Sequence, residues 1–135
     1  MKSTSKFISL LILVFTLFSF IPERADSQYK LILFEGSDWC VNCIRLERNV
    51  LTDDTFQGFM SNTEISLERI DFPQRKEQDA ATKAYNSEMA EKYNFQGIFP
   101  TIILVNVNTG ERANLEYIDQ STADFIHQIK IHLPK

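Results

Sequence analysis

The chain has 135 residues, of which 44% are hydrophobic and 24% charged, and its formal net charge is −4. This length predicts a single domain, and the acidic balance argues against the basic surface that a nucleic-acid-binding protein needs. Two cysteines can form at most one disulfide, so the fold depends on a hydrophobic core and not on a disulfide scaffold.

The N-terminal residues 1–27 are predicted to be a secretory signal peptide. Lys2 and Lys6 form a short positive head before an apolar run over residues 7–21. That run is shorter than the stretch of about 20 apolar residues that a membrane-spanning helix needs. Small residues then follow at the positions that a signal peptidase reads. The alternative interpretation is a leader that stays uncleaved as a membrane anchor.

The mature protein is therefore predicted to be one domain, residues 28–135. Export places the two cysteines in a compartment where disulfides persist. We expect the protein in the periplasm, with secretion from the cell as the alternative, and we expect a monomer.

In the first half of the mature chain, the pattern predicts a buried strand, two helices and a second strand. Gly36 ends the first apolar run, and the first helical pattern begins near Cys40. Polar residues able to cap a helix precede the next helix, which has Phe56, Phe59 and Met60 as its apolar positions. The predicted ranges are a strand at 29–35, a helix at 40–51, a short helix after 52–54 and a strand at 64–71.

In the second half, the pattern predicts a long helix, a hairpin and a C-terminal helix. Residues 74–93 are polar and favour helix, with a charge-dense start that we interpret as a solvated face. Strands at 101–107 and 111–118 flank an Asn-Thr-Gly turn. Ser121 and Asp124 indicate a capping box for the final helix, whose apolar residues share one face.

The resulting order, β-α-β-α-β-β-α, predicts an α/β fold. Two strands joined through a helix pair in parallel with a right-handed crossover, whereas the hairpin strands are antiparallel. We therefore expect a small mixed four-stranded sheet with helices on both faces.

Cys40 and Cys43 are three positions apart, directly after a strand and a Gly-Ser-Asp turn. On the first turn of a helix, residues with this spacing face the same side. Free N–H groups and the positive end of the helix dipole favour thiolate over thiol there. We expect Cys40 to lie near the N-cap with the exposed sulfur and to attack a substrate disulfide. Cys43, more buried, would then attack Cys40 and close the internal bridge.

Other interpretations of the cysteine pair have less support from the sequence. A bridge that closes a ring of about four residues adds little loop-entropy stabilisation, so a structural staple is disfavoured. A tetrahedral metal site needs more ligands, and His127 and His132 lie off a common helix face. Attachment of haem needs a histidine after Cys43, but Ile44 stands there. We expect neither a metal nor an organic cofactor.

A family resemblance rests on two motifs in order. Trp-Cys-Val-Asn-Cys at 39–43 follows a strand, and Gly-Ile-Phe-Pro-Thr at 97–101 opens a later one. With both, residues 29–133 resemble the thioredoxin-fold family, and more closely its exported bacterial thioredoxin-like proteins.

The resemblance implies roles at matching positions. Cys40 matches the attacking cysteine and Cys43 the resolving one, which together form a redox-active disulfide. Trp39 matches the aromatic residue beside the active site. Pro100 matches a cis-proline that faces the cysteines and turns the backbone of Phe99 toward an extended substrate. From the sequence alone, a trans proline at a strand start is the default.

The chain departs from the family pattern in three respects. The first strand and helix of the family are missing, which predicts one sheet edge with less protection. The family often has a buried aspartate six residues before the attacking cysteine, and Phe34 stands there. Glu35 is expected to be a solvated residue at the sheet end, on the face opposite to Phe34. The Val-Asn pair between the cysteines lacks the histidine of strongly oxidising relatives, which leans toward a reductase or an intermediate potential.

The sequence therefore predicts an exported thiol–disulfide oxidoreductase. Its expected substrates are disulfide-containing proteins bound near Trp39, Phe99 and Pro100, and its expected partner is a membrane-borne or periplasmic redox protein. Two alternatives stay open. One is a non-catalytic binding module that holds a thiol ligand or Cu(I). The other is an interaction protein with an inert disulfide.

Overall fold

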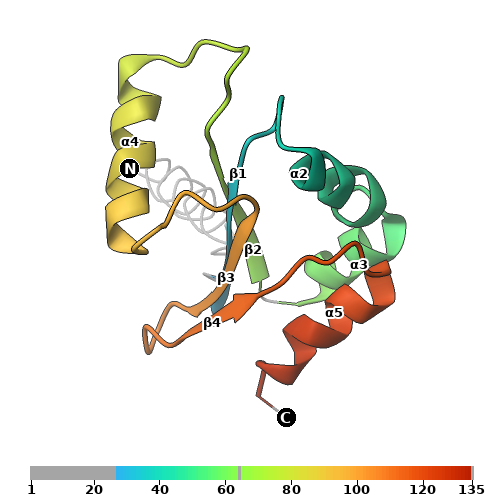
Figure 1. Cartoon of the computed structure of the whole chain (residues 1–135). Coiled ribbons are helices and arrows are strands. Elements are labelled where there is room, and N and C mark those ends of the chain that lie inside the picture. Colours follow the sequence, from blue (N-terminus) through green and yellow to red (C-terminus); the bar gives the residue numbers. More distant parts are fainter. Residues whose placement is uncertain (1–26, 64, 135) are drawn as a thin grey trace, which may run out of the picture.

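The computed structural model describes residues 27–63 and 65–134 (Figure 1). The predicted signal peptide, residues 1–27, therefore lies outside the described residues except for Ser27. Within the described part of the chain, every helix is too short or too polar to span a bilayer.

The elements follow the predicted order of strands and helices. Cys40 is the N-cap of the first helix, and Asp53 and Ser121 cap two later helices through their side chains. In chain order the elements are β1 (Tyr29–Glu35), α2 (Val41–Leu46), the π-helix η2 (Glu47–Leu51), α3 (Asp54–Asn62), β2 (Ile65–Asp71), α4 (Ala80–Lys92), β3 (Thr101–Asn106), β4 (Arg112–Leu115) and α5 (Thr122–Ile131).

The four strands form one mixed sheet in the order β2-β1-β3-β4. β1 pairs in parallel with β2 and antiparallel with β3, and β3 and β4 form the antiparallel hairpin. These pairings confirm the prediction. Among residues 27–63 and 65–134, no strand pairs with the outer edge of β2.

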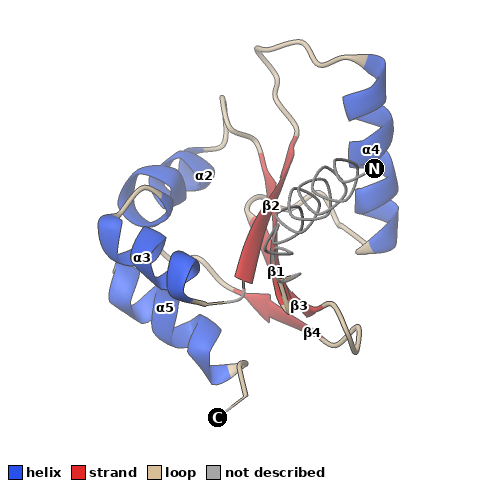
Figure 2. Cartoon of the chain, turned by 180° about the vertical axis from the view of Figure 1, so that it is seen from behind, coloured by secondary structure: helices blue, strands red, loops and turns tan. Residues whose placement is uncertain are grey.

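Alternation along β1 divides the core into two layers. Leu31 and Leu33 pack with α3, α5 and the helix after the cysteines, whereas Ile32 and Phe34 face α4. Of the described helices, Figures 1 and 2 show α4 on one face of the sheet and α2, α3 and α5 on the other. In the α4 layer the ring of Phe34 stacks on that of Phe95, with 4.5 Å between centroids.

The first helix changes from α-helical to π-helical hydrogen bonding after Leu46. The amide of Thr52 donates to the carbonyl of Glu47, five residues back, at 3.1 Å, and residues 47–51 are π-helical. The sequence predicted a helix to about Leu51 without this widening. π-turns inside helices are often found at functional sites.

The long helix predicted for residues 74–93 is wrong at its start. α4 begins at Ala80, because the side chain of Asp79 accepts the amide of Thr82 as an N-cap at 2.6 Å. The segment before it is a loop, whose backbone N–H groups bind a carboxylate elsewhere in the chain. Met89 on α4 and Tyr93 at its C-cap are buried against the sheet.

The last strand is shorter than the predicted 111–118. β4 ends at Leu115, because the amide of Glu116 donates to the side chain of Gln128 on α5, at 2.9 Å. Ser121 is confirmed as the N-cap of α5, with the amide of Asp124 donating to Ser121 Oγ at 3.2 Å. The Asp124 carboxylate accepts the hydroxyl of Ser121, at 2.6 Å, where a full capping box would have it accept the backbone amide.

Candidate active site

The loop that leads into the cysteines is compact and closed by its own backbone. The amides of Trp39 and Cys40 donate to the carbonyl of Gly36, at 3.3 and 2.9 Å. A Cβ atom at Gly36 would overlap the indole of Trp39, so this position requires glycine. The turn ends with Cys40 in extended backbone, at φ −76° and ψ 109°, from which α2 begins.

Cys40 and Cys43 form a disulfide, with their Cα atoms 5.2 Å apart. The amide of Cys43 donates to Cys40 Sγ at 3.2 Å, so the sulfur occupies the capping position of α2. The same N–H group can stabilise negative charge on Cys40 Sγ in the reduced pair. Cys40 is 7% exposed and Cys43 2% exposed. The predicted order of exposure is confirmed, but Cys40 is more buried than expected.

The loop before β3 lies opposite the disulfide. The peptide bond between Phe99 and Pro100 is cis, as the resemblance implied. The ring of Phe99 packs edge-on against that of Trp39, with 5.2 Å between centroids. A shallow depression of about 350 Å³ is lined by Trp39, Cys40 and Phe99, among others. The structure therefore brings these three predicted residues together, while Pro100 lines the adjoining groove and Cys43 lies below the surface.

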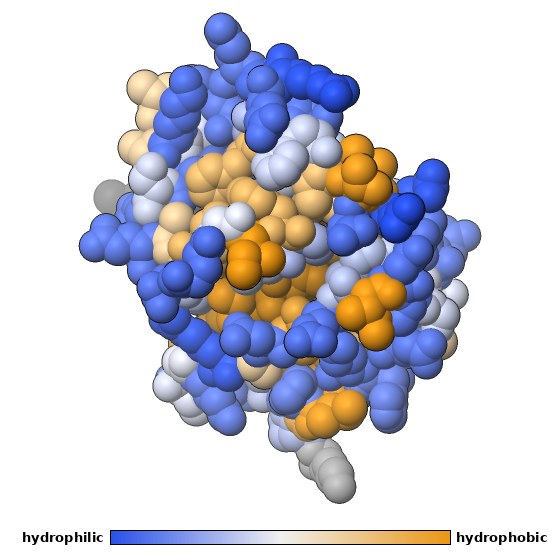
Figure 3. Space-filling model, viewed as in Figure 1, coloured by the Kyte–Doolittle hydropathy of each residue, from blue (hydrophilic) through white to orange (hydrophobic). Residues whose placement is uncertain are grey.

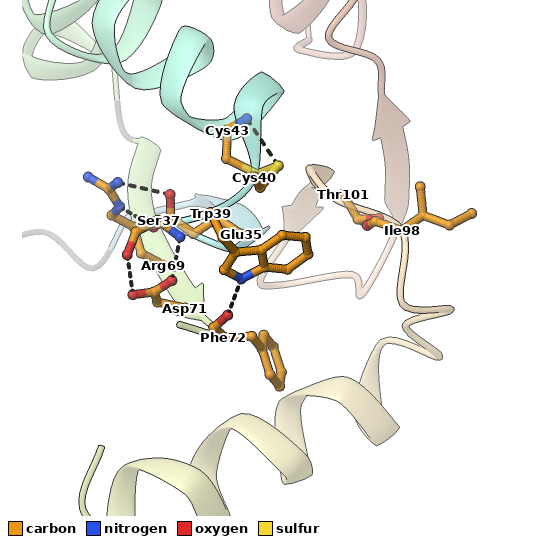
Figure 4. The surroundings of a disulfide bond; sticks show 10 residues. All are labelled: Glu35, Ser37, Trp39, Cys40, Cys43, Arg69, Asp71, Phe72, Ile98 and Thr101. Atoms are coloured by element: carbon orange, nitrogen blue, oxygen red, sulfur yellow. Dashed lines mark hydrogen bonds and ion pairs between the residues drawn. A yellow bond between two sulfur atoms is a disulfide. The ribbon is translucent and has the colours of Figure 1, made fainter. Parts of the chain in front are cut away.

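Three side chains between Gly36 and Cys40 connect the loop to the end of β2 and to the chain that follows it. Ser37 donates through its amide and its hydroxyl to Asp71, at 2.8 and 2.6 Å. Trp39 Nε1 donates to the carbonyl of Phe72 at 2.8 Å. Figure 4 shows these contacts beside the disulfide. They fix the orientation of the indole and of the turn that presents Cys40.

Asp38 makes the third connection. Its carboxylate accepts the amides of Gln74, Arg75 and Lys76, at 2.9, 2.8 and 3.0 Å. The pKa of Asp38 lies below its ordinary value of 3.8 because of these hydrogen bonds, and the one from Gln74 has the largest effect. The sequence interpretation missed this residue. No local pattern marks it, because the amides that it binds lie 36 to 38 residues further along the chain.

Glu35 is not the solvated residue that the sequence predicted. Its side chain is 3% exposed and accepts two hydrogen bonds from Arg69, from Nε at 2.6 Å and from Nη2 at 2.9 Å. Arg69 Nη2 also lies 2.7 Å from Glu47 Oε2, an ion pair without hydrogen-bond geometry. Arg69 on β2 thus joins the end of β1 to the helix that carries the cysteines. The expected orientation, opposite to Phe34, is confirmed.

The polar groups near the disulfide do not form a metal site. Among residues 27–63 and 65–134, no group of three or more His, Cys, Asp and Glu side chains is placed to hold a metal ion. His127 and His132 are both exposed on α5 and at its end. The chemistry that the arrangement itself offers is exchange at the two sulfurs.

Comparison with known proteins gives a consistent result. Residues 23–121 match the family model of the thioredoxin-like domain. The chain is 25% identical over 108 residues to the disulfide bond reductase DsbH of Chlamydia pneumoniae. That alignment covers 80% of this chain but 64% of the relative, so the chain spans a little under two thirds of the curated protein it matches.

Solved structures show the same fold. The DsbH oxidoreductase superposes with a TM-score of 0.70 at 25% identity, covering 78% of this chain and 72% of that one. A thioredoxin from Thermus thermophilus gives 0.51 at 16% identity, covering 77% and 72%. The C-terminal domain of DsbD from Neisseria meningitidis, in the reduced form, gives 0.50 at 15% identity, covering 78% and 83%.

Proposed function

The chain belongs to the thioredoxin-like family, and on this basis we propose that it is an exported thiol–disulfide oxidoreductase that reduces disulfides in other proteins. The observation that carries this proposal is the disulfide between Cys40 and Cys43 at the N-terminus of α2, beside a depression that Cys40 lines. The reductive direction is supported by the similarity to a disulfide bond reductase.

Cys40 is assigned as the attacking residue because it lines the depression and its sulfur accepts the amide of Cys43. In the reduced protein, the Cys40 thiolate attacks one sulfur of the substrate disulfide. A bond forms between the two sulfurs, the substrate disulfide breaks, and its other sulfur leaves as a thiolate that takes up a proton.

Cys43 completes the reaction. After losing its proton to water, it attacks Cys40, so that the internal bridge forms and the mixed disulfide breaks. The second substrate sulfur leaves and is protonated, and two electrons have passed to the substrate. We assign the proton acceptor to water and not to Glu35, because both carboxylate oxygens of Glu35 are bound to Arg69.

The substrate approaches along Trp39, Phe99 and Pro100, which border the cysteines. The oxidised pair must then be reduced again by a dithiol of another redox protein, membrane-borne or periplasmic. Residues 28–135 form the working domain after removal of residues 1–27.

An equilibrium titration in a dithiothreitol or glutathione buffer tests whether the pair exchanges electrons. We expect a reduction potential near about −270 mV, as in reducing thioredoxins. A value near about −120 mV would reverse the direction, and one below about −300 mV would indicate an inert structural bridge.

A trapping experiment tests the assigned roles. In Cys43→Ser the mixed disulfide cannot be resolved, so we expect substrate proteins to accumulate on Cys40. The matched variant Cys40→Ser should trap none. Equal trapping by both variants would refute the assignment of Cys40 as the attacking residue and Cys43 as the resolving one.

A further inference from the structure

The outer side of α2 and η2 is exposed directly after Cys40. Spacings of three, four and seven positions place four exposed side chains on this side, namely Val41, Ile44, Arg45 and Arg48. We call these four residues the α2 face. Val41 is 62% exposed and Ile44 is 43% exposed. In Figure 3 an apolar patch with hydrophilic side chains around it lies over the part of the surface where Figure 1 places α2.

The α2 face carries positive charge, although the formal net charge of the chain is −4. Glu47 is the one acidic residue at positions 41–51, and its carboxylate lies 2.7 Å from Arg69 Nη2 of β2. The charge of Glu47 is therefore compensated by a residue outside the α2 face.

The two arginines of the α2 face have little compensation within the protein. Arg45 Nη1 lies 3.9 Å from Asp119 Oδ2, too far for a hydrogen bond, and both side chains are about half exposed. Arg48 Nε donates to the neutral side chain of Asn49 at 3.2 Å, and among the described residues no carboxylate forms an ion pair with Arg48. A carboxylate of another molecule can therefore bind here without displacing a strong internal partner.

The α2 face is continuous with the redox site. Val41 and Asn42 line the depression that contains Cys40. Arg48 lies eight residues beyond Cys40, which corresponds to about 12 Å along a helix axis. A protein whose sulfur reaches Cys40 from this side therefore covers the α2 face as well.

Two kinds of protein must reach Cys40, and a fixed charge pattern suits one of them better. Substrate proteins differ in sequence around their disulfides, so no single arrangement of charges fits them all. The electron donor must bind again after every turnover, and complementary charges raise the rate and fix the orientation of that encounter. A lipid surface fits less well, because a membrane on the α2 face would also cover Cys40.

We infer that the α2 face binds the protein that donates electrons to the Cys40–Cys43 disulfide. This donor has carboxylates and an exposed apolar side chain beside its own dithiol, which complement the arginines and the apolar pair of the α2 face. The inference rests on the proposed function and names a surface for its redox partner.

The transfer consists of two exchange steps. A donor thiolate attacks Cys40 Sγ, a bond forms between these sulfurs, the Cys40–Cys43 bond breaks, and Cys43 leaves as a thiolate that takes up a proton. The second donor thiol loses its proton to water and attacks the first donor sulfur, which releases Cys40 as a thiolate. Two electrons have then passed to the pair, and the donor holds a disulfide.

Two reduced synthetic peptides serve as donors in the test. Both contain the same Cys-x-x-Cys dithiol with a leucine beside it. They differ in having glutamate or glutamine at the third and fourth positions on either side, which an extended chain places about 10 to 14 Å from the dithiol. Fluorescence of Trp39, the single tryptophan of the chain, follows reduction of the disulfide beside it.

At an ionic strength of about 10 mM, we expect the glutamate peptide to reduce the protein about fivefold faster than the glutamine peptide. Net charge alone predicts the opposite order, because a chain with a net charge of −4 repels an acidic peptide. At about 1 M salt, where the screening length is about 3 Å, the two rates should be equal.

Paired variants locate the effect. Arg45→Gln combined with Arg48→Gln should remove the advantage of the glutamate peptide. Lys83→Gln combined with Lys92→Gln removes the same charge from exposed positions of α4, on the other face of the sheet, and should preserve the advantage. Ile44→Ser should slow both peptides by about threefold, as expected for a lost apolar contact. Dithiothreitol, which is small and uncharged, should reduce every variant within about twofold of the wild-type rate.

The outcomes are distinguishable. If both peptides reduce the wild type equally at low salt, or if the α4 variant loses the advantage as well, the inference is overturned while the proposed function stands. The inference is also overturned if dithiothreitol and the glutamate peptide slow equally with the double arginine variant, because the arginines then act on the thiol chemistry. Sedimentation of the wild type, but not of that variant, with phosphatidylglycerol vesicles would assign the face to a membrane instead. If neither peptide nor dithiothreitol reduces the pair, the proposed function itself is refuted.

Discussion

At the scale of single residues, Arg69 connects β2 to the end of β1 and to the helix that follows the cysteines. It binds both carboxylate oxygens of the buried Glu35 and reaches Glu47 on the neighbouring helix. Loss of one partner of a buried pair leaves the other charge without compensation. Because the Arg69 side chain is 39% exposed, water can replace part of what is lost.

Arg69→Gln should therefore lower the free energy of unfolding by about 2 kcal/mol, below the range for fully buried pairs. Urea denaturation measures this. The surface pair Lys30–Glu68 is the matched control, and Lys30→Gln should cost about 0.5 kcal/mol or less.

A double-mutant cycle shows whether the effect comes from the pair itself. Glu35→Gln combined with Arg69→Gln should cost at least about 1 kcal/mol less than the sum of the two single changes. Additive costs would mean that Arg69 acts through packing alone.

At the scale of elements, Asp38 organises the loop between β2 and α4. Its carboxylate accepts three consecutive amides, which lowers its pKa in the folded state, the hydrogen bond from Gln74 having the largest effect. Because the folded pKa lies below the unfolded one, this stabilisation is complete above the ordinary value of 3.8 and is lost as the pH falls through the lower, folded value.

We expect Asp38→Asn to destabilise the protein at pH 6, and the difference from the wild type to shrink as the pH falls below the ordinary value of 3.8. Urea unfolding at several pH values measures the difference. Hydrogen exchange at Gln74, Arg75 and Lys76 shows whether the loop loses protection. Glu77→Gln removes a charge from the same loop and is the control for the exchange measurement. A constant difference at all pH values would contradict the role of the Asp38 charge.

The same loop shows where prediction from sequence stops. Apolar spacing and capping residues predicted the order of the strands and helices and most of their ends, because those signals are local. The false helical start at residues 74–79 has a local and a distant cause. Asp79 caps α4, and Asp38, 36 residues from Gln74, binds the amides of the loop before it. The burial of Glu35 was missed because its partner Arg69 lies 34 residues away.

The residues of the candidate site also differ in whether a local sequence pattern predicted them. Spacing and local pattern located Cys40 and Cys43, since the chemistry depends on a helix N-terminus. The cis peptide at Pro100 followed only from the family resemblance. The groove that Pro100 lines matches no sequence pattern, because it exists only where β3 and β4 separate.

At the scale of the whole molecule, the two layers of the core are independent of the disulfide. Most of the large buried side chains, such as Phe34, Phe56 and Phe125, lie in clusters on the two faces of the sheet that do not include the cysteines. The fold should therefore persist when the pair is reduced, which a catalyst that cycles between both forms requires.

The stability of the two redox forms consequently reports the direction of electron flow. A bridge between residues three positions apart closes a ring of about four residues, for which loop entropy predicts about 2 kcal/mol in favour of the oxidised form. We expect urea denaturation to show the oxidised protein more stable than the dithiothreitol-reduced protein by that amount or less. By the thermodynamic cycle, a disulfide that stabilises the fold is harder to reduce in the folded chain than in the unfolded chain, so the folded dithiol is the better donor of electrons. If the reduced form is instead the more stable by several kcal/mol, as in strong oxidants, the pair accepts electrons from its substrates and the reductive direction proposed for this protein is wrong.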